Sequence, residues 1–461
     1  MENEAPSSSD TIFALSSASG KAGVSIIRIS GPKAWDTLKI FNSKVKYDCA
    51  REAKFLKLYH PKTGDVVDEV VFVGFKGPHS FTGEDVIELY CHGSLAVIEE
   101  IYEVLSGLDG LRIAEHGEFT RRAFENEKLD LTEAEAIADL IDAETKAQKD
   151  QALAQMGGSL SRLYNGWTED LAKILAYAEA VIDFPDEEVP DDEIQKIYPD
   201  LEALAVQIKE HLDDDRRGER LREGIKIAVI GAPNAGKSTF INALANRDVA
   251  IVSDMAGTTR DIIEVHLNLG GYPVIIADTA GLRPELIGKE GHDAIESEGI
   301  RRALEYAENA DLKILMFDGS QDSLHQSTID LIDKNSIVLI NKTDINKNNN
   351  ALYKNLHKIH TDYFEISAQT GEGLSAMLEK LTGQISNMLN ISRESATITR
   401  ARYRSNLENT YENIQIALQQ SQPELFSQEL RFAINSLGRI TGRIDAEDLL
   451  DIIFKDFCIG K

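Results

Sequence analysis

A glycine-rich stretch, GAPNAGKS at residues 231–238, is the part of the sequence with the clearest chemistry. Its spacing fits G-x-x-x-x-G-K-[ST], in which glycines let backbone N–H groups turn inward around phosphate oxygens. A helix that begins directly after the glycines adds positive potential at the same place. Lys237 would then reach the β- and γ-phosphates, and the hydroxyl of Ser238 would ligate magnesium. The stretch therefore predicts a nucleotide phosphate site.

Two further motifs supply the groups that a nucleoside triphosphate needs around its γ-phosphate. Residues 278–281 read D-T-A-G after a buried strand, so Asp278 would hold magnesium through water and the Gly281 amide would contact the γ-phosphate. A threonine pair at 258–259 precedes an expected edge strand, and one of its hydroxyls would complete the magnesium shell. We expect residues 253–261 to be a switch segment, ordered by the γ-phosphate and released after hydrolysis.

A fourth motif selects the base. N-K-T-D at 341–344 follows another strand, and Asp344 is suited to accept from N1–H and the 2-amino group of guanine, two adjacent donors. Adenine would set an acceptor against that carboxylate and leave a buried charge unpaired, which costs about 1–3 kcal/mol or more. Ser367-Ala368 ends the last strand and can offer a backbone N–H to guanine O6. The motifs together predict GTP rather than ATP.

The expected contacts with GTP come from these motifs and from the switch segment. They are Asn234, Ala235, Gly236, Lys237, Ser238, Thr239, Ser253, Asp254, Met255, Ala256, Gly257, Thr258, Thr259, Asp278, Thr279, Ala280, Gly281, Asn341, Lys342, Asp344, Ser367 and Ala368. Each motif alone is a short polar loop pattern, but their order along the chain makes each more specific.

The residues leave the hydrolysis machinery open. Leu282 stands where Ras-type proteins carry a water-orienting glutamine, and leucine cannot polarise water. No arginine finger can be assigned from the sequence. The side-chain carbonyl of Asn234, with backbone carbonyls from 253–258, could hold a monovalent cation instead. The candidate bases after the switch motif, among which composition does not choose, are Glu290, Glu296 and Glu298.

The motifs need a sheet to bring them together, and the hydrophobic pattern supplies one. Strands are expected at 225–230, 262–267, 273–277, 312–317, 337–340 and 363–366. Helical patterns lie between most of them, which predicts a mostly parallel sheet covered on both faces. Gly270-Gly271 sits between two strands and predicts a hairpin, so one edge strand should be antiparallel.

The flanking regions have a different pattern. Residues 10–125 mix short strands, such as those at 24–29, 66–75 and 86–90, with Gly and Ser turns, which indicates a separate α/β module. A helix with a Thr132/Glu135 capping box follows, with an interruption expected at Gly157-Gly158. A second helical stretch carries Leu171, Ile174, Leu175, Ala178 and Ile182 at helical spacing.

The acidic segment DFPDEEVPDDE at 183–193 is interpreted as a solvated loop. After about residue 384 the chain is helical to its end and has no obvious second half. We therefore expect it to pack on the helices of 130–220, with the sheet domain inserted between them. The expected domains are 1–125, 126–221, 222–383 and 384–461. The fold class is multi-domain, α+β and α/β, with an N-terminal module, a helical domain and an inserted Ras-like P-loop G domain.

Composition limits the function classes. The chain has 461 residues, 42% of them hydrophobic and 27% charged, which is typical of a globular protein of about two to four domains. Its net charge of −28 excludes a protein that coats nucleic acid by bulk electrostatics. The three cysteines, Cys49, Cys91 and Cys458, argue against a disulfide framework or a zinc site. No signal peptide or membrane span is recognised, so a cytoplasmic location is expected.

The motifs and their flanks closely resemble the TrmE or MnmE family of tRNA modification GTPases, in the TrmE-Era-EngA-YihA-Septin-like superfamily. The resemblance runs nearly from end to end of the chain. It is carried by SIIRISG (25–31), SFTGEDVIEL (80–89), GEFTRRAFENEKLDLTEAEAIADLIDA (117–143), VIDFPDEE (181–188), GAPNAGKST (231–239), SDMAGTTRD (253–261), DTAGLR (278–283), NKTD (341–344) and FCIGK (457–461).

The resemblance implies a homodimer whose G domains pair in a potassium-dependent, GTP-driven cycle. It also implies a heterotetramer with an FAD- and NADH-using partner called GidA or MnmG. Together they would add an aminomethyl-type group to C5 of the wobble uridine of certain tRNAs. The carbon would come from a tetrahydrofolate derivative, 5-formyl- or methylene-tetrahydrofolate, held by the N-terminal module, which would also dimerise.

Matching positions imply roles for individual residues in GTP hydrolysis. The potassium ligands would be Asn234, Ser253, Met255 and Thr258, and the magnesium ligands would be Ser238 and Thr259. The family's catalytic glutamate precedes a G-I-x-R-A segment, and residues 299–303 match it, so Glu296 is the expected catalytic residue. The chain is longer than usual before that segment, which leaves Glu290 and Glu298 open.

The same matching implies a folate site. Its residues would be Arg28, Glu88, Lys128 and Lys461. A pterin edge has guanine-like donors for Glu88, and Arg28 and Lys128 could pair with an anionic glutamyl tail. Ala22 and Ser94 stand where the family has glycines near this pocket.

Two other features keep alternative interpretations. Cys458 is either a participant in the modification chemistry or a small buried hydrophobe, and the second is favoured. The run RARYR at 400–404 is the best local candidate for RNA contact, with a solvated helical face as the alternative. For the whole chain, the alternatives are an RNA-binding switch GTPase of the ribosome-assembly kind and a scaffold that binds GTP but hydrolyses it negligibly.

Replacing Asp344 by Asn should weaken GTP binding and shift the preference towards xanthine nucleotides. The amide would present a donor where the carboxylate accepts, and xanthine offers a carbonyl in place of the 2-amino group of guanine. Competition between GTP and XTP for the purified chain measures the shift. An unchanged guanine preference would contradict the role given to this residue.

Overall fold

The structure is a computed structural model that describes residues 10–45, 50–183, 191–247, 263–278, 306–321, 324–345, 356–357, 362–389, 396–444, 447–455 and 457–460. The chain forms two compact units. The first comprises residues 1–138, 155–201 and 412–461, and the second comprises residues 139–154 and 202–411. Each unit therefore combines segments that are far apart in the sequence. The domain boundaries placed from the sequence stay predictions.

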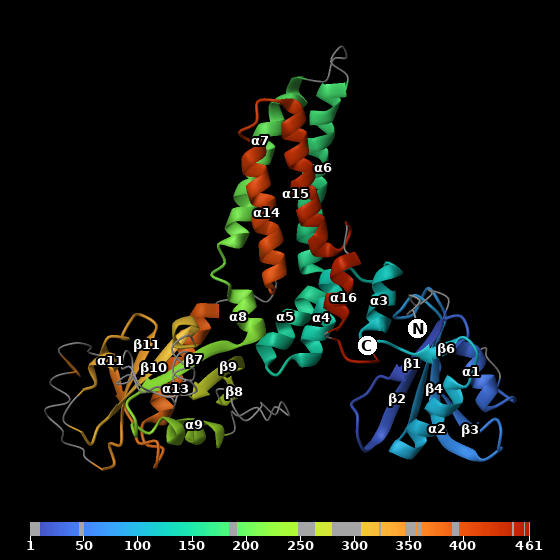
Figure 1. The fold of residues 1–461 in the computed structure, drawn as a ribbon, viewed down its shortest axis with the longest axis horizontal. Helices are drawn as coiled ribbons and strands as arrows, with labels where there is room; N and C mark the ends of the chain where they lie inside the picture. Colours follow the sequence, from blue (N-terminus) through green and yellow to red (C-terminus); the bar gives the residue numbers. More distant parts are fainter. Residues whose placement is uncertain are drawn as a thin grey trace, which may run out of the picture. The chain divides into compact units, whose positions relative to one another are not determined.

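A six-stranded sheet in the order β3-β4-β5-β2-β1-β6 forms the N-terminal part of the first unit (Figure 1). Its strands are β1 (Thr11–Leu15), β2 (Ala22–Ser30), β3 (Lys54–Tyr59), β4 (Val66–Phe75), β5 (Val86–Gly93) and β6 (Leu111–Ile113). Neighbours pair antiparallel except β1 and β6, which pair parallel. The three strands expected here are confirmed, and β2 and β5 are longer than expected.

Helices cover the two faces of this sheet unequally. On one face, α1 (Ala34–Phe41) and α2 (Leu95–Ser106) pack their apolar residues with those of the strands in one buried cluster. On the other face, α3 (Glu118–Glu125) covers β1, where Phe119 packs with Ile12 and Ala14. Further along that second face, apolar side chains of β3 and β4 remain exposed.

The helical region begins with α4 (Leu131–Asp142), two residues earlier than the expected cap at Thr132 would place it. The predicted Thr132/Glu135 capping box is wrong. Asp130 Oδ1 accepts from the Glu133 amide at 2.9 Å, and Glu133 Oε2 accepts from the Asp130 amide at 3.0 Å. These reciprocal bonds form the box, because the helix starts directly after an aspartate, which is a strong N-cap residue. Thr132 and Glu135 are buried instead.

The remaining helices of this region follow in sequence. They are α5 (Lys146–Met156), α6 (Ser159–Asp183), α7 (Asp191–Leu212), α14 (Ala401–Ala417), α15 (Pro423–Thr441) and α16 (Glu447–Lys455). Gly158, at φ +77°, separates α5 from α6 as predicted. The acidic segment is not a loop throughout, since its first residue ends α6 and its last three begin α7. Its residues 184–190 lie outside the described ranges.

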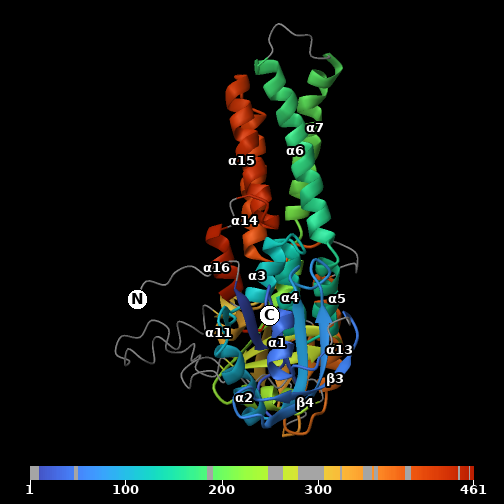
Figure 2. The same cartoon turned by 90° about the vertical axis from the view of Figure 1, so that its right-hand side faces the viewer.

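The C-terminal helices do pack on the earlier ones, as the unmatched apolar patterns predicted. Figures 1 and 2 both show α15 beside α6. Arg431 of α15 pairs with Glu179 of α6 at 2.6 Å, and Phe426 of α15 stacks on Tyr198 of α7 with ring centroids 5.4 Å apart. The expected helical domain with an inserted G domain is therefore confirmed. No helix in the described ranges has the length and apolar character needed to cross a bilayer.

The end of the chain docks on the N-terminal module. Residues 457–460 leave α16 and run beside the first strand and the turn before α3. Ser16 Oγ donates to the carbonyl oxygen of Gly460 at 2.7 Å, and Nδ1 of His116 lies 2.9 Å from that of Phe457. The first and last segments of the sequence therefore form one structure.

The favoured interpretation of Cys458 as a buried hydrophobe is wrong, because its side chain is exposed. Its backbone carbonyl accepts from the Gly117 amide at 3.4 Å, while the neighbouring Phe457 side chain is buried. In an extended segment successive side chains point to opposite sides, so burial of Phe457 turns the thiol outward.

The second unit contains a six-stranded sheet in the order β12-β11-β10-β7-β9-β8. Its strands are β7 (Ile225–Gly231), β8 (Ile263–Leu269), β9 (Tyr272–Asp278), β10 (Leu312–Asp318), β11 (Ser336–Asn341) and β12 (Tyr363–Glu365). All neighbours are parallel except β8 and β9, which form a hairpin around Gly270 and Gly271. The predicted strands, the hairpin and the antiparallel edge are confirmed.

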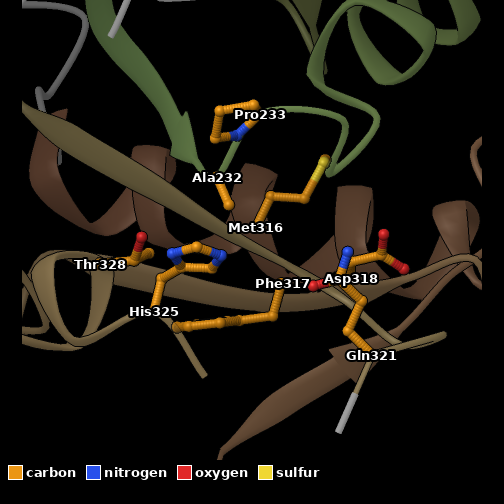
Figure 3. A pocket seen from close by; sticks show the side chains of 8 residues that line it. All are labelled: Ala232, Pro233, Met316, Phe317, Asp318, Gln321, His325 and Thr328. Atoms are coloured by element: carbon orange, nitrogen blue, oxygen red, sulfur yellow. The ribbon is translucent and has the colours of Figure 1, made fainter. Parts of the chain in front are cut away.

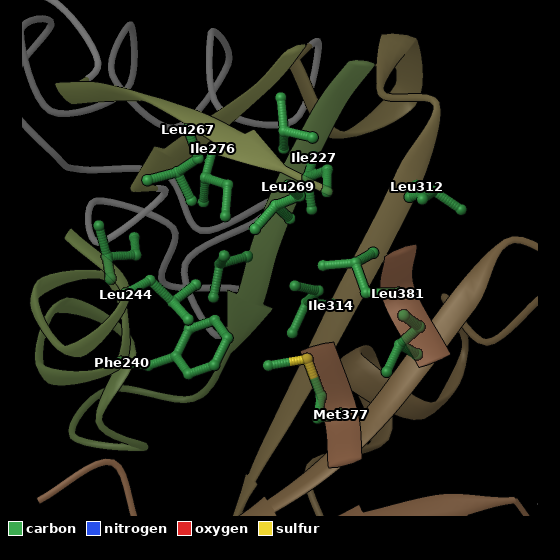
Figure 4. Close-up of a cluster of buried hydrophobic side chains, with 14 of the residues drawn as sticks. Ile227, Phe240, Leu244, Leu267, Leu269, Ile276, Leu312, Ile314, Met377 and Leu381 are labelled. Carbon is green, nitrogen blue, oxygen red and sulfur yellow. The ribbon is translucent and has the colours of Figure 1, made fainter. Parts of the chain in front are cut away.

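Helices pack on this sheet with an apolar core that fixes its position. The helices are α8 (Arg217–Glu223), α9 (Lys237–Ala245), α11 (Gln326–Ile329) and α13 (Leu374–Leu389). Figure 4 shows Phe240 of α9 and Met377 of α13 directed towards Ile227 and Ile314 of the central strands. Parallel strands buried on both faces need such continuous apolar runs, which is why their pattern was readable from sequence.

Replacing Gly460 by Ala should release the end of the chain from the N-terminal module. Gly460 has φ +97°, and an added Cβ would overlap the Leu15 carbonyl oxygen. A left-handed backbone costs a non-glycine residue about 1–2 kcal/mol, and the overlap adds to that. Because Phe457 is buried in the docked end, we expect chymotrypsin to cleave after it about tenfold faster.

Gly166→Ala is the matched control. This glycine lies within α6, and a Cβ added there would have no atom within 4 Å, so cleavage after Phe457 should not change. An unchanged cleavage rate in Gly460→Ala as well would contradict the docking.

Candidate functional site

The glycine-rich loop joins β7 to α9 through two left-handed residues. Asn234 has φ +63° and Gly236 has φ +96°, so the chain turns sharply before Lys237 opens the helix. A Cβ at Gly236 would overlap the side-chain nitrogen of Asn341, which makes glycine necessary there. This strand–loop–helix arrangement is the context that the phosphate motif requires.

The side chain of Lys237 bonds to the backbone of its own loop. Its side chain is 5% exposed, and Nζ donates to the carbonyl oxygens of Gly231 at 2.9 Å and Ala232 at 3.1 Å. The ammonium group therefore lies at the N-terminus of α9, where the helix dipole also favours an anion. A fixed cation and a helix N-terminus together make a phosphate site.

Asn341 ties three loops together beneath this site. Its Nδ2 donates to the Ala235 carbonyl at 2.8 Å, and its Oδ1 accepts from the Ala368 amide at 2.9 Å. Its backbone carbonyl accepts from the Gly319 amide at 2.7 Å. The side chain is 2% exposed, so all of these bonds are made away from solvent. The first residue of the N-K-T-D motif thus bonds to the phosphate loop, and its predicted contact with GTP stays a prediction.

Lys342 is also fixed by the protein. Its Nζ pairs with Asp318 Oδ2 at 2.7 Å, and its backbone has φ +65°. Burial alone would raise the pKa of Asp318, but its bonds with Lys342 and Ser320 outweigh burial and lower it. The carboxylate therefore stays ionised, and the lysine stem is held along the base side of the sheet edge.

The residues predicted to read the base follow β11 and β12 at the same edge of the sheet. Asp344 is exposed, whereas Ser367 and Ala368 are buried. The Thr343 amide donates to the Ile366 carbonyl at 3.3 Å, which joins the two loops. Because carboxyl ends of parallel strands meet at one edge, these loops and the phosphate loop lie at the same edge of the sheet, and their predicted roles in binding the nucleotide stay predictions.

Part of the predicted site cannot be placed. Asp278 ends β9 in register with Val229 of β7, but nothing is described of its side chain. The other predicted residues outside the described ranges are Ser253, Asp254, Met255, Ala256, Gly257, Thr258, Thr259, Thr279, Ala280, Gly281, Glu290, Glu296, Glu298 and Lys461. Their roles stay predictions.

A small pocket borders the phosphate loop (Figure 3). Ala232 and Pro233 of the loop form one wall, and the end of β10 forms another. His325 and Thr328, from the start of α11, close it, and the buried Thr328 hydroxyl has no hydrogen-bond partner in the described part of the chain. No sequence pattern pointed to these two residues, because neither belongs to a spaced motif.

A second polar site lies in the N-terminal module. Arg28 of β2 and Glu88 of β5 are directly opposite each other in the sheet. Arg28 Nη2 lies 2.9 Å from Glu88 Oε1, and the Tyr90 hydroxyl donates to Glu88 Oε2 at 2.9 Å. Burial and the bond to Glu88 both raise the pKa of Tyr90, so it remains a donor. The sequence predicted Arg28 and Glu88 but missed Tyr90, two residues further along the same strand face.

Aromatic rings surround the arginine of this pair. The guanidinium of Arg28 lies 5.4 Å from the ring centre of Phe81 and 5.7 Å from that of Phe119. The Lys128 side chain runs past Gly83, where an added Cβ would lie 3.4 Å from it. Carboxylate, guanidinium and aromatic faces together suit a planar ligand with hydrogen-bonding edges.

The arginine run at 400–404 is used inside the protein. Arg404 is buried and bonds to Asp214 and Glu219, and Arg400 pairs with Asp139 at 2.7 Å. The interpretation of this run as an RNA contact or a solvated face is therefore wrong for these two residues. Their partners lie 185 to 261 positions away in the sequence, so spacing could not show them.

Comparison with known proteins identifies two families of domain. Residues 131–458 match the MnmE helical domain, and residues 11–128 match the GTP-binding protein TrmE N-terminus. Among solved structures, the chain is similar to Aquifex aeolicus Era bound to GDP and AlF4− at 25% identity, with a TM-score of 0.28 over 43% of this chain and 69% of that chain. It is also similar to the G domain of the T. maritima FeoB iron transporter at 24% identity, with a TM-score of 0.24 over 36% and 98%.

Curated relatives match the whole chain. The tRNA modification GTPase MnmE of Parvibaculum lavamentivorans is 48% identical over 98% of this chain and 100% of its own length. The proteins of the same name from Rickettsia rickettsii and Paramagnetospirillum magneticum are 44% and 45% identical, again over 98% of this chain and 100% of theirs. The chain therefore belongs to the MnmE family of tRNA modification GTPases.

Proposed function

We propose that this chain is the GTPase subunit of a complex that adds an aminomethyl or carboxymethylaminomethyl group to C5 of the wobble uridine, position 34, of certain tRNAs. As a member of its family, it is a GTP-hydrolysing enzyme that acts in tRNA modification. The observation that carries the finer proposal is the presence in one chain of a phosphate loop and of a separate Arg28–Glu88 site. The first provides a switch and the second provides a place for a one-carbon donor.

The nucleotide would bind at the phosphate loop of the second unit. Lys237 and the first turn of α9 supply charge-assisted bonds to its phosphates. Asp344 reads guanine. The Ser367 and Ala368 amides already donate to Glu372 and Asn341, so guanine O6 would have to share or replace one of these bonds. Each of these residues binds or orients GTP, and the loop does so with little rearrangement because its shape is already fixed.

Magnesium and potassium are part of this proposal. Ser238 and Asn234 are exposed beside the loop, with oxygen atoms of the kind that both cations prefer. The further ligands would be Thr259 for magnesium and Ser253, Met255 and Thr258 for potassium. The cations would stabilise the charge that develops on the phosphates, and Glu296 would act on the attacking water. These roles rest on the family resemblance.

A tetrahydrofolate derivative would bind in the N-terminal module. Arg28 contacts Oε1 of Glu88 through both Nε and Nη2, and the Tyr90 hydroxyl donates to Oε2, so a pterin donor would take the second acceptor position of Oε2. Arg28 and the rings beside it would pack on the planar ligand, with Lys128 and Lys461 near its anionic tail. The docked chain end supports this view, because it brings the exposed Cys458 into the same unit.

A homodimer is proposed on the exposed face of the same sheet. Phe55, Val71 and Tyr90 are consecutive neighbours across β3, β4 and β5, and Phe55 is 67% exposed. Contiguous apolar groups next to a polar site favour a protein interface. A second copy is the occupant that the family resemblance favours, and covering Phe55 would also shield the Arg28–Glu88 pair from solvent.

The remaining chemistry requires a partner. Flavin and nicotinamide binding are assigned to the GidA or MnmG protein, which would form a heterotetramer with the homodimer. The tRNA would be shared by both proteins, and the reaction would take place in the cytoplasm.

GTP hydrolysis by the purified full chain should be about tenfold faster in potassium chloride than in sodium chloride at equal ionic strength. Potassium would supply the positive charge that an arginine finger provides in other GTPases, since no arginine finger can be assigned here. Phosphate release at saturating GTP measures the difference. Asn234→Ala should remove it, whereas Asn335→Ala, an exposed asparagine of the same unit, should not. Equal, near-zero rates in both salts would favour the scaffold hypothesis.

The modification itself is tested by mass spectrometry of wobble uridines from cells that lack this protein. The C5-modified nucleoside should disappear, and the wild-type gene should restore it. Lys237→Ala and Glu88→Gln should each fail to restore it, because one removes the phosphate contact and the other a pterin acceptor. Glu88→Gln should still hydrolyse GTP. Arg431→Gln, which breaks an exposed helix pair, is the control and should restore modification. Persistence of the modified uridine without the protein would refute the proposal.

A further inference from the structure

Two short segments connect the G-domain sheet to the helices. The incoming segment, residues 213–224, contains α8 and ends at β7, and the outgoing segment, residues 396–400, leads into α14. Both lie in the second unit together with residues 139–154, which form the end of α4 and most of α5. This helical piece is thus grouped with the nucleotide-binding sheet. Specific polar contacts explain the grouping.

Asp139 at the end of α4 joins both segments with one carboxylate oxygen. Its Oδ1 accepts from Arg222 Nε at 2.8 Å and from Arg400 Nη2 at 2.7 Å. Arg222 belongs to the incoming segment and Arg400 to the outgoing one. The Asp139 side chain is 13% exposed, so these charge-assisted bonds are largely shielded from solvent.

Gln151 of α5 bridges the same two segments without charge. Its Nε2 lies 3.2 Å from the Gly218 carbonyl oxygen and 3.3 Å from Thr397 Oγ1. At this point the segments touch, because a Cβ on Gly218 would overlap the Ile398 carbonyl oxygen. Two residues of the helical piece, Asp139 and Gln151, therefore bond to both the incoming and the outgoing segment. These two residues are called the clamp below.

Arg404, in the first turn of α14, adds a third link between the two connections. Its Nη2 donates to Asp214 Oδ1 at 2.7 Å, its Nη1 to the Leu212 carbonyl at 2.9 Å, and its Nε lies 3.2 Å from Glu219. Burial lowers the pKa of Arg404, but the bonds to Asp214 and Glu219 outweigh it, so the guanidinium remains charged. All of its contacts are to the incoming side of the G domain.

The clamp is also attached to the sheet. Arg220 of α8 pairs with Asp311 at 2.7 Å, directly before β10, and Leu221 lies in the core of the sheet. The Ala147 amide of α5 donates to the Gly271 carbonyl in the β8–β9 turn at 3.1 Å. The strand β8 begins directly after the segment that the sequence predicts to respond to the γ-phosphate.

We propose that Asp139 and Gln151 are positioning residues that make residues 139–154 move as one body with the G domain, while Arg404 fixes the incoming connection through Asp214 and Glu219. Movement at the nucleotide is then passed to α4 and α5 instead of being lost in flexible connections. A buried ionic network adds little stability over apolar packing, but its directional bonds fix one geometry. Both connections are held by the same residues, so neither can pivot alone.

Hydrogen–deuterium exchange of the full chain tests this proposal, with GDP and with a non-hydrolysable GTP analogue. In the wild type, amide exchange within residues 139–154 should differ by about threefold or more between the two nucleotides. In Asp139→Asn and in Gln151→Ala this difference should disappear, while peptides of β7 and α9 keep theirs. The kcat and KM for GTP should stay within about twofold of wild type, since neither residue touches the nucleotide.

Arg431→Gln is the matched control, because it breaks an exposed ion pair in the first unit and should keep the wild-type response. Thermal melting shows whether each variant folds. If Asp139→Asn does not fold, Gln151→Ala, which removes only neutral bonds, tests the proposal by itself. A wild type without a nucleotide response at 139–154 would overturn the proposal, and so would folded variants that keep the response. Neither result would bear on the folate or wobble-uridine chemistry, since the inference depends only on GTP binding.

Discussion

One buried amide organises the nucleotide site. Asn341 donates to the phosphate loop at Ala235, accepts from the base loop at Ala368, and binds Gly319 after the neighbouring strand. A side chain with one donor and one acceptor end is needed, because a carboxylate would repel the Ala235 carbonyl and an apolar residue would leave two buried groups unpaired. The loops that meet phosphate and base are thereby held at a fixed separation before any nucleotide arrives.

Internal polar bonds also account for several arginines of this acidic chain. In the described part of the chain, Arg122, Arg400 and Arg404 are all committed to carboxylates or backbone carbonyls. They join segments of the chain rather than present charge to solvent. With a net charge of −28, the chain does not bind nucleic acid by bulk electrostatics.

The sequence predicted those elements that are determined by local residue patterns. Buried parallel strands such as β7 and β10 are continuous apolar runs, and the glycine pair at 270–271 marks the hairpin. The strand boundaries of this sheet could therefore be predicted to within a few residues. The helix cap at Asp130 was missed because two overlapping capping patterns exist and only packing selects between them. Arg404 and Cys458 were misread for a different reason. Their surroundings are formed by residues far away in the sequence, which spacing cannot reveal.

The docked chain end affects how the protein is made. The unit that contains the first strands also contains residues 412–461, and Gly460 bonds to Ser16. During synthesis the N-terminal sheet leaves the ribosome long before these residues exist. Ser16 and Gly460 are 444 positions apart, so the surface around Ser16 and His116 is completed only after the whole of the sequence between them has been synthesised.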